Sequence, residues 1–240
     1  MGFLRKLWGG RDRSVVLGAR DCHCHVIPGV DDGSRSTDES LAILRLLVGD
    51  GVRRVIATPH IYPGRFDNEP EDLRPRFDDL LRERDAAGIE VELELGAEHW
   101  LDDSLEARVR EGRVLAFGPE RYLLFETTTG PHVPPQLLQT VHAMVQAGYT
   151  PLCAHVERYA YLRDEEGQEV LEDLRAAGAR FQVNRTVGKA NVPGRGERGR
   201  FIAALLERGW LDEVGSDLHR PTPQGRPHSQ TTRSPASISA

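Results

Sequence analysis

The chain lacks the features of several large protein classes. Only three cysteines, Cys22, Cys24 and Cys153, occur among 240 residues, which excludes a disulfide framework and makes a cytoplasmic setting the expectation. No apolar run approaches the roughly 20 residues that a transmembrane helix needs, so no membrane span is expected. The formal net charge of −6 disfavours a nucleic-acid-binding protein that relies on a broad basic face, and no nucleic-acid partner is expected.

Three common catalytic signatures are also missing. A cysteine-dependent phosphatase needs an arginine separated from its cysteine by five residues, but the corresponding positions hold Pro28, Val30 and Tyr159. There is no glycine-rich phosphate loop of the P-loop type and no Gly-x-Ser-x-Gly elbow. We therefore interpret the cysteines as small core residues, and metal-assisted hydrolysis is the reaction class that remains.

Composition divides the chain into three parts. Residues 1–17 are basic with interleaved apolar side chains and are predicted to be an N-terminal extension. Residues 221–240 are rich in Pro, Ser, Thr, Gln and Arg, which predicts a disordered tail. The part from 18 to 220 alternates short apolar segments with amphipathic ones and is predicted to be the folded domain.

That alternation predicts an α/β fold with parallel strands. Strands are expected at 21–25, 53–58, 90–96, 122–126, 150–155, 180–184 and 212–217. Helices are expected at 37–50, 70–87, 101–111, 134–147, 165–177 and 198–208, several of them followed by glycine. Seven strand–helix units without a last helix favour a parallel barrel, although periodicity alone does not distinguish a barrel from an open sheet.

Side chains that can bind metal stand at the C-terminal end of most predicted strands, where barrel enzymes build their active sites. Residues two apart on a strand face the same side. The side chains of His23 and His25 on the first strand are therefore expected to lie together, as are those of Asp217 and His219 at the last strand. The imidazole and carboxylate mixture suits Mn, Fe or Zn better than a thiolate site would. The residues are His23, His25, His60, Glu98, Glu126, His155, Asp217 and His219. His99, His132, His142 and His228 fall outside this pattern and are interpreted as structural or surface residues.

The motifs resemble those of a known family. His23-x-His25, the segment 27–33 (IPGVDDG) and 57–60 (ATPH) are similar to the polymerase-and-histidinol-phosphatase (PHP) superfamily, and within it to CpsB/YwqE-type protein-tyrosine phosphatases of capsule and exopolysaccharide synthesis. The segments 154–159 (AHVERY), 182–184 (QVN) and 216–219 (SDLH) agree with this resemblance. It covers roughly residues 18–220.

The resemblance implies a distorted seven-stranded (β/α)7 PHP barrel with three divalent metal ions, most often manganese, at the C-terminal ends of its strands. It implies as ligands His23, His25, Asp32, His60, Glu98, Glu126, His155, Asp217 and His219. The choice of Asp32 over Asp31 comes from the family and not from spacing. Arg158 is implied as the catalytic arginine that holds the substrate phosphate, with Arg220 or Arg226 as a second phosphate-binding residue.

The implied activity is hydrolysis of phosphotyrosine on the tail of a bacterial tyrosine kinase, by a protein that can form a homo-oligomer. Two alternatives remain open. One is a phosphoesterase for a small ester such as histidinol phosphate, which the 155–159 segment (HVERY) disfavours. The other is a weakly catalytic kinase-binding module, favoured by Arg185-Thr186-Val187, which replace the small residues usual after this strand; Val156 also stands where the family has proline.

Overall fold

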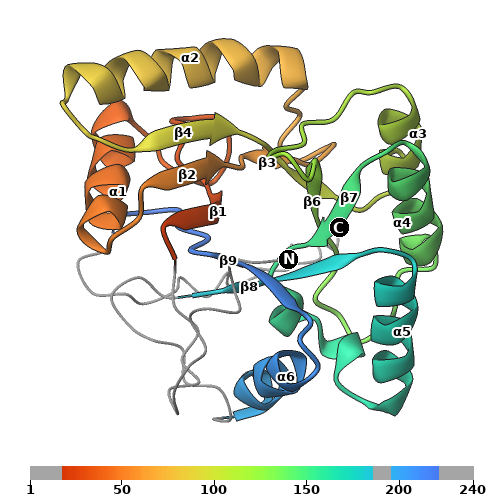
Figure 1. The fold of residues 1–240 in the computed structure, drawn as a ribbon. Coiled ribbons are helices and arrows are strands. Elements are labelled where there is room, and N and C mark those ends of the chain that lie inside the picture. Colours follow the sequence, from red (N-terminus) through yellow and green to blue (C-terminus); the bar gives the residue numbers. More distant parts are fainter. Residues whose placement is uncertain (1–17, 186–195, 222–240) are drawn as a thin grey trace, which may run out of the picture.

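The computed structural model describes residues 18–185 and 196–221, in which strands and helices alternate as predicted (Figure 1). The strands are β1 (Arg20–Cys24), β2 (Arg54–Ala57), β3 (His60–Ile61), β4 (Glu92–Leu95), β5 (Glu98–Trp100), β6 (Tyr122–Glu126), β7 (Thr150–Cys153), β8 (Arg180–Asn184) and β9 (Leu211–Gly215). The helices are α1 (Thr37–Gly49), α2 (Pro70–Ala86), α3 (Leu105–Arg110), α4 (Leu137–Gln146), α5 (Glu165–Ala176) and α6 (Gly196–Glu207), with short 3-10 turns η2 (Val156–Arg158) and η3 (Ala160–Leu162).

Some predictions fall on other parts of the chain. The N-terminal extension at 1–17 and the tail, apart from residue 221, lie outside the described residues. The same holds for Thr186, Val187, Arg226 and His228, so the structure says nothing of the roles predicted for them.

All strand pairs are parallel, and the strands form two sheets. One has the order β1-β2-β4 and the other the order β3-β5-β6-β7-β8-β9, with the helices on the outside (Figure 1). The predicted α/β class with parallel strands is confirmed. A single closed seven-stranded barrel is not confirmed, because the strand ladders divide into these two sheets.

The division into two sheets arises at a kink that the sequence prediction missed. The strand expected at 53–58 ends at Ala57 as β2, and a further strand that was not predicted, β3, begins at His60, directly after Pro59, which has no N–H to donate. The expected strand at 90–96 is likewise followed by β5 after Gly96 and Ala97. Because β3 and β5 pair in parallel with His60 opposite Glu98, the kinked extensions bring these two polar side chains together.

Helix boundaries differ from the predictions mainly at their starts. The helix expected from residue 101 begins at Leu105, because the Asp102 side chain accepts the backbone N–H groups of Ser104 and Leu105 at 2.8 and 3.1 Å. Such local acceptors favour a turn over a helix. The helix expected from 134 begins at Leu137, and the last helix begins at Gly196 instead of 198.

The cysteines and the unassigned histidines take the places expected for them. Cys22, Cys24 and Cys153 are all free, fully or almost fully buried, and belong to apolar clusters. His99 is buried between two backbone groups, with Nδ1 3.0 Å from the Leu124 oxygen, and burial lowers its pKa to about 4. His132 and His142 are exposed. Among the described residues no helix has the length and apolar character needed to cross a membrane.

The partly buried ion pair between Arg20 on β1 and Glu213 on β9 leads to a prediction about pH and stability. Burial raises the pKa of Glu213 to about 7 despite its contact with Arg20, so the folded state favours the protonated carboxyl group. The resulting stabilisation is complete below the unfolded-state pKa of about 4.5 and is lost as pH rises through about 7. We expect the free energy of unfolding of wild type, relative to Glu213→Gln, to fall by up to about 3 kcal/mol across this range.

Denaturant unfolding of wild type and Glu213→Gln at a series of pH values measures the difference between their free energies of unfolding. Groups that titrate in the same way in both proteins do not contribute to this difference. A difference that stays constant between pH 4.5 and 7 would show that the Glu213 carboxylate is not penalised by burial.

Candidate metal centre

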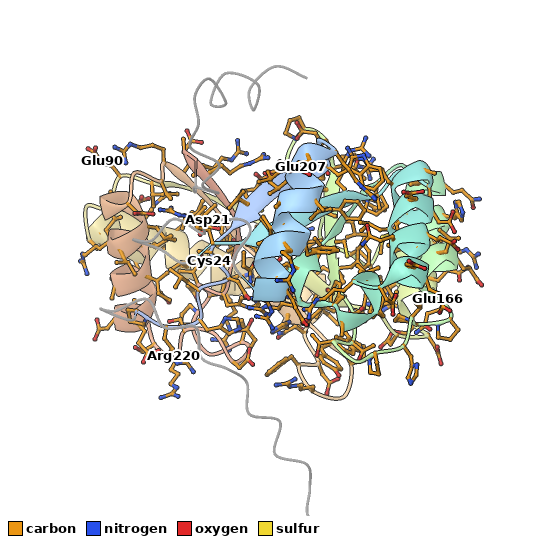
Figure 2. All side chains as sticks on the ribbon, turned by 90° about the horizontal axis from the view of Figure 1, so that it is seen from below. Asp21, Cys24, Glu90, Glu166, Glu207 and Arg220 are labelled. Carbon is orange, nitrogen blue, oxygen red and sulfur yellow. The ribbon has the colours of Figure 1, made fainter. Side chains whose placement is uncertain are left out.

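All nine predicted ligands lie at the same end of the strands. Figure 2 shows the direction of β1. The strand runs from Asp21, on the side of the molecule that carries Glu90, to Cys24, on the side that carries Arg220. The ligands follow or end the strands on the Arg220 side. His23 and His25 come from the end of β1, Asp32 from the following loop, His60 from β3, Glu98 from β5, Glu126 from β6, His155 from the end of β7, and Asp217 and His219 from the segment after β9.

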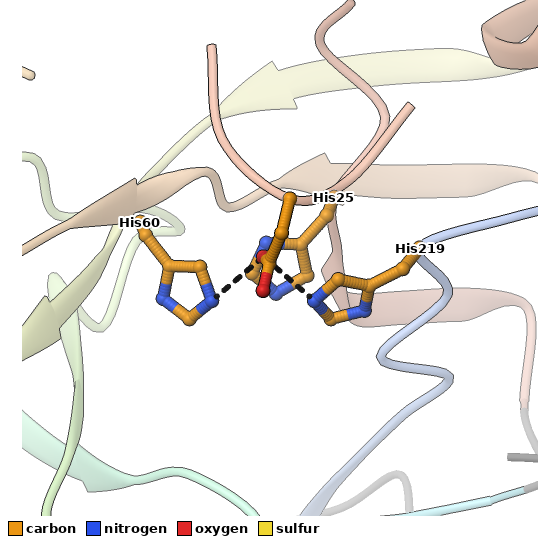
Figure 3. Close-up of side chains that lie close together, drawn as sticks. His25, His60 and His219 are labelled. Atoms are coloured by element: carbon orange, nitrogen blue, oxygen red, sulfur yellow. Dashed lines mark ion pairs between the residues drawn. The ribbon is translucent and has the colours of Figure 1, made fainter. Parts of the chain in front are cut away.

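Seven of the nine residues form three groups able to hold a metal ion, and the groups share members. In each group, one ligand atom per residue lies within 4.8 Å of the others. The groups are His25, Asp32, His60 and His219; His23, His25 and Glu98; and His60, Glu98 and Glu126. Figure 3 shows the first group, in which the Asp32 carboxylate lies between His60 and His219, 3.4 and 3.3 Å from their Nε2 atoms. Shared members are the arrangement expected of a cluster of neighbouring ions.

Glu98 is the carboxylate on which the groups converge. Its Oε2 lies 3.1 Å from His23 Nε2, 3.3 Å from His25 Nε2 and 3.2 Å from His60 Nδ1. Its other oxygen, Oε1, lies 2.9 Å from His155 Nε2. One buried carboxylate surrounded by four imidazole rings is suited to bridge ions, because each oxygen can serve a different ion.

Asp217 and His155 adjoin the three groups without belonging to them. Asp217 Oδ1 is 3.5 Å from His23 Nε2 and 3.3 Å from His25 Nε2. Both residues have positive φ angles, 52° for Asp217 and 32° for His155, a conformation that costs energy in residues other than glycine. Their backbones are held there, because Asp217 N donates to His23 O at 2.7 Å and His155 N donates to the Gln182 side chain at 2.7 Å.

The geometry distinguishes the two adjacent aspartates. Asp31 uses both oxygens within the protein: Oδ2 accepts from His25 Nδ1 at 2.8 Å and from His60 N at 2.9 Å, and Oδ1 accepts from Gly33 N at 2.8 Å. Asp32 Oδ1 is buried and accepts no hydrogen bond. This supports Asp32 as the ligand and Asp31 as the residue that orients His25.

Buried side-chain nitrogen and oxygen atoms that form no hydrogen bond show whether these residues are suited to bind a metal ion. Buried polar atoms in proteins almost always form hydrogen bonds, and exceptions call for an explanation. Four buried atoms here form no hydrogen bond: Asp32 Oδ1, His60 Nδ1 and His219 Nε2, which have only ion-pair contacts of 3.1 to 3.4 Å, and His155 Nδ1. Imidazole nitrogens and carboxylate oxygens without thiolates are the donor set of Mn, Fe or Zn, so the residues fit divalent cations of this kind.

Electrostatics keeps the carboxylates of the site ionised. Burial raises the pKa of Glu98, but the nearby His23 and His60 outweigh it and hold that pKa well below its ordinary value. Asp217 behaves in the same way, since Arg158 and His23 lower its pKa more than burial raises it. Burial lowers the pKa of His60, whereas Glu98 and two further carboxylates raise it to about 10. The ionised carboxylates thus attract positive charge, which protons on the neighbouring imidazoles supply here and metal ions could supply instead.

The three candidate arginines have different surroundings. Arg158 Nη2 donates to Asp217 Oδ2 at 2.5 Å, while 31% of its side chain stays exposed. Arg220 donates to the backbone oxygen of His219 and lies 4.0 Å from Glu39 at the start of α1, so its guanidinium is directed toward that helix. Arg226 is outside the described residues.

Sequence reasoning missed two residues at the site. Gln182 Oε1 accepts from His155 N and lies 3.2 Å from His23 Nδ1, so it holds two predicted ligands at once. Its polar side chain between Phe181 and Val183 on a buried strand was the available signal. Arg65, with 51% of its side chain exposed, has Nη2 3.6 Å from Asp32 Oδ2, and nothing in its loop sequence indicated this.

The position of Asp31 gives a prediction about metal affinity. Asp31→Asn removes the charge that holds His25 Nδ1 and is expected to weaken metal binding about 10- to 100-fold, the usual effect of losing such a partner. Competition with a chelator of known affinity measures it. Asp67→Asn is the matched control, because Asp67 also accepts a backbone N–H but lies on an exposed loop. Equal affinities of Asp31→Asn and wild type would contradict the orienting role.

Comparisons with known proteins agree with the chemistry of the site. The family model of capsular polysaccharide synthesis proteins, CpsB/CapC, matches residues 19–235. The tyrosine-protein phosphatase YwqE of Bacillus subtilis is 31% identical over 200 residues, which cover 83% of this chain and 76% of that protein. The tyrosine-protein phosphatase CpsB of Streptococcus pneumoniae is 29% identical over 206 residues, or 83% and 82% of the two chains.

Solved structures are similar as well. One reported for YwqE of Bacillus subtilis and CpsB of Streptococcus pneumoniae, described as metal-dependent tyrosine phosphatases, matches with a TM-score of 0.73 and 29% identity over 84% of this chain and 79% of that one. An amidohydrolase from Mycoplasma synoviae matches with a TM-score of 0.51 and 12% identity over 85% and 73% of the chains, a likeness of fold alone.

Proposed function

We propose that this chain, which belongs to the CpsB/CapC family of capsular polysaccharide synthesis proteins, is a metal-dependent phosphatase that hydrolyses phosphotyrosine in proteins. The observation that carries this proposal is the convergence of four imidazoles on the buried Glu98 carboxylate, beside an arginine that keeps part of its side chain exposed. The relatives named tyrosine-protein phosphatases supply the substrate class.

The proposed ligands are the nine residues predicted from the sequence, holding three ions, with manganese favoured over iron or zinc. Divalent cations held there would act as Lewis acids, activating water at neutral pH and neutralising charge on the phosphoryl oxygens. The protein fixes the geometry through Asp31 on His25 and Gln182 on His23 and His155. The glycine at position 33 lets the loop pass close to His25, because a Cβ at that position would collide with the backbone oxygen and the Cβ of His25.

Arg158 is the proposed substrate-binding residue. Its contact with Asp217 fixes the guanidinium at the edge of the ligands, and Asn184 Nδ2 donates to the same Asp217 oxygen at 2.7 Å. The exposed part of the guanidinium offers further N–H groups to a phosphate, where a planar fork matches two oxygens at once. Tyrosinate is a comparatively good leaving group, so the proposal needs no strong general acid.

We infer further that the two sheets are parts of one distorted seven-stranded barrel. Two backbone hydrogen bonds support continuity across the kinks: Gly96 N donates to Ala57 O at 2.9 Å, and Glu98 N donates to Pro59 O at 3.0 Å. Between the first and last strands, His25 N donates to Leu218 O at 3.0 Å. A barrel of this kind would explain why proposed ligands from most of its strands meet at one end.

The physiological substrate that we propose is a tyrosine-phosphorylated kinase tail in the cytoplasm. A phosphotyrosine peptide tests the activity, using manganese-loaded protein beside a His23→Ala variant and a chelator-treated sample. Hydrolysis in wild type and its loss in both controls are expected. No hydrolysis by wild type whose metal content has been verified would overturn the phosphotyrosine assignment.

A further inference from the structure

An aromatic layer lies immediately outside the proposed ligands. His60 on β3 is paired with Glu98 on β5 in parallel register, and the residues two positions further, Tyr62 and Trp100, face the same side as these ligands. Their rings stack with centroids 4.4 Å apart and an interplanar angle of 4°. Two residues along a strand span about 7 Å, so the rings lie one strand period beyond His60 and Glu98, and Trp100 is level with the ligand Glu126 on β6.

Arg65 and Phe66 connect this layer to the ligands. The Arg65 guanidinium carbon lies 5.7 Å from the Tyr62 ring centroid and 5.1 Å from that of Phe66. Phe66 in turn stacks on the ligand His60, with centroids 5.3 Å apart and planes 9° apart. We call Tyr62, Arg65, Phe66 and Trp100 the aromatic layer.

The layer is preformed. Residues 62–66 make a tight turn closed by two backbone hydrogen bonds, Tyr62 N to Phe66 O at 3.0 Å and Phe66 N to Tyr62 O at 2.7 Å. Gly64 at the turn has φ 80°, which suits glycine, and its N–H donates to Asp67 Oδ1 at 2.6 Å. A rigid surface of this kind binds a ligand without first having to become ordered.

Core packing alone does not account for these rings. His60 and Glu98 are buried, but Tyr62, Phe66 and Trp100 are all partly exposed, and none belongs to an apolar core cluster of the described residues. Apolar ring surface left in contact with water has a cost that burial against a ligand would recover. These partly exposed rings lie beside the charged residues proposed as metal ligands. This position points to a ligand with one charged end and one aromatic end.

We propose that the aromatic layer packs against the phenol ring of the substrate and selects aryl phosphates over alkyl phosphates; this rests on the proposed phosphatase function. In phosphotyrosine the ester oxygen joins the phosphate directly to the ring. A phosphate held beside His60 and Glu98 therefore places the ring one strand period further outward, beside Tyr62 and Trp100. Offset or edge-to-face contact with these rings favours an aromatic group over an alkyl chain.

The test compares binding of two phosphonates that are not hydrolysed, so that leaving-group chemistry does not enter. Phenylphosphonate carries the ring and methylphosphonate does not. Calorimetric titration of manganese-loaded protein is expected to give a Kd for phenylphosphonate that rises roughly three- to tenfold in Trp100→Leu and in Tyr62→Leu. The Kd for methylphosphonate is expected to stay within about twofold of wild type.

Trp210→Leu is the matched control. Trp210 is also a partly buried tryptophan, with the Arg208 guanidinium carbon 4.8 Å from its ring centroid, but it precedes β9, at the end of that strand opposite Asp217 and His219. It should alter neither Kd. If Trp100→Leu fails to fold, the Tyr62→Leu variant still tests the proposal.

The proposal is overturned by any of three results: wild type that binds both phosphonates equally, wild type that does not bind phenylphosphonate, or variants that weaken both ligands alike. Failure of the phosphatase function gives a different result. Wild type would then bind phenylphosphonate in a manner dependent on Trp100 without hydrolysing the phosphotyrosine peptide.

Discussion

Glu98→Gln is expected to lower kcat/KM for a phosphotyrosine peptide by at least about 10³-fold, because metal ions contribute several kcal/mol to such reactions. The substitution keeps the size of the side chain but removes the charge on which His23, His25, His60 and His155 converge. Metal analysis of the purified variant should find fewer bound ions than in wild type. The loss of activity should therefore accompany a loss of metal.

Glu94→Gln is the matched control for this experiment. Glu94 lies on the neighbouring strand β4, where it pairs with Arg54 at 2.6 Å and accepts the Gly118 N–H at 2.7 Å. The Glu94→Gln variant carries the same chemical change at a position away from the proposed ligands. Its activity and its metal content should therefore match those of wild type. Full metal content with wild-type activity in Glu98→Gln would exclude Glu98 as a shared ligand.

The second large effect is expected for Arg158→Lys, with a decrease of about 10²-fold or more in kcat/KM and unchanged metal content. Lysine retains the charge beside Asp217 but loses the planar fork that matches two phosphate oxygens. Steady-state kinetics together with metal analysis separate this loss from a failure to bind ions. The phosphate-binding role predicts that the two measurements diverge in this variant and change together in Glu98→Gln.

Arg175→Lys serves as the comparison for Arg158. Arg175 also donates to a carboxylate at 2.5 Å, that of Asp212, and 22% of its side chain is exposed, but it lies on α5 away from the ligands. The same substitution there should change kcat/KM by less than about threefold. Equal losses in the two variants would mean that the arginine–carboxylate pairs act on the fold and not on the substrate.

The clustering of these histidines and carboxylates at one end of the strands could be predicted because its sequence signal is local. A histidine two residues from another on an apolar strand, or an aspartate directly after one, needs only the strand period to be interpreted. The same is true of the buried cysteines on the opposite face of β1. The family resemblance added Asp32, which spacing alone could not separate from Asp31.

What could not be predicted depends on contacts between distant segments. The stacking of Tyr62 on Trp100 requires the register between β3 and β5, and both strands lie beyond the ends of the predicted ones. The late start of α3 depends on the hydrogen bonds of one aspartate, Asp102, which competes with the helix. Gln182 has a role only because β8 lies beside β7, whose end carries His155, and because its side chain also reaches His23 on β1.

The most direct test of the metal centre is X-ray diffraction at the manganese absorption edge, from crystals of manganese-loaded protein that hydrolyses a phosphotyrosine peptide. Anomalous density is expected at the three groups that share His25, His60 and Glu98. Active crystals with anomalous density elsewhere, or with none at these residues, would contradict a metal-dependent phosphatase built on this site.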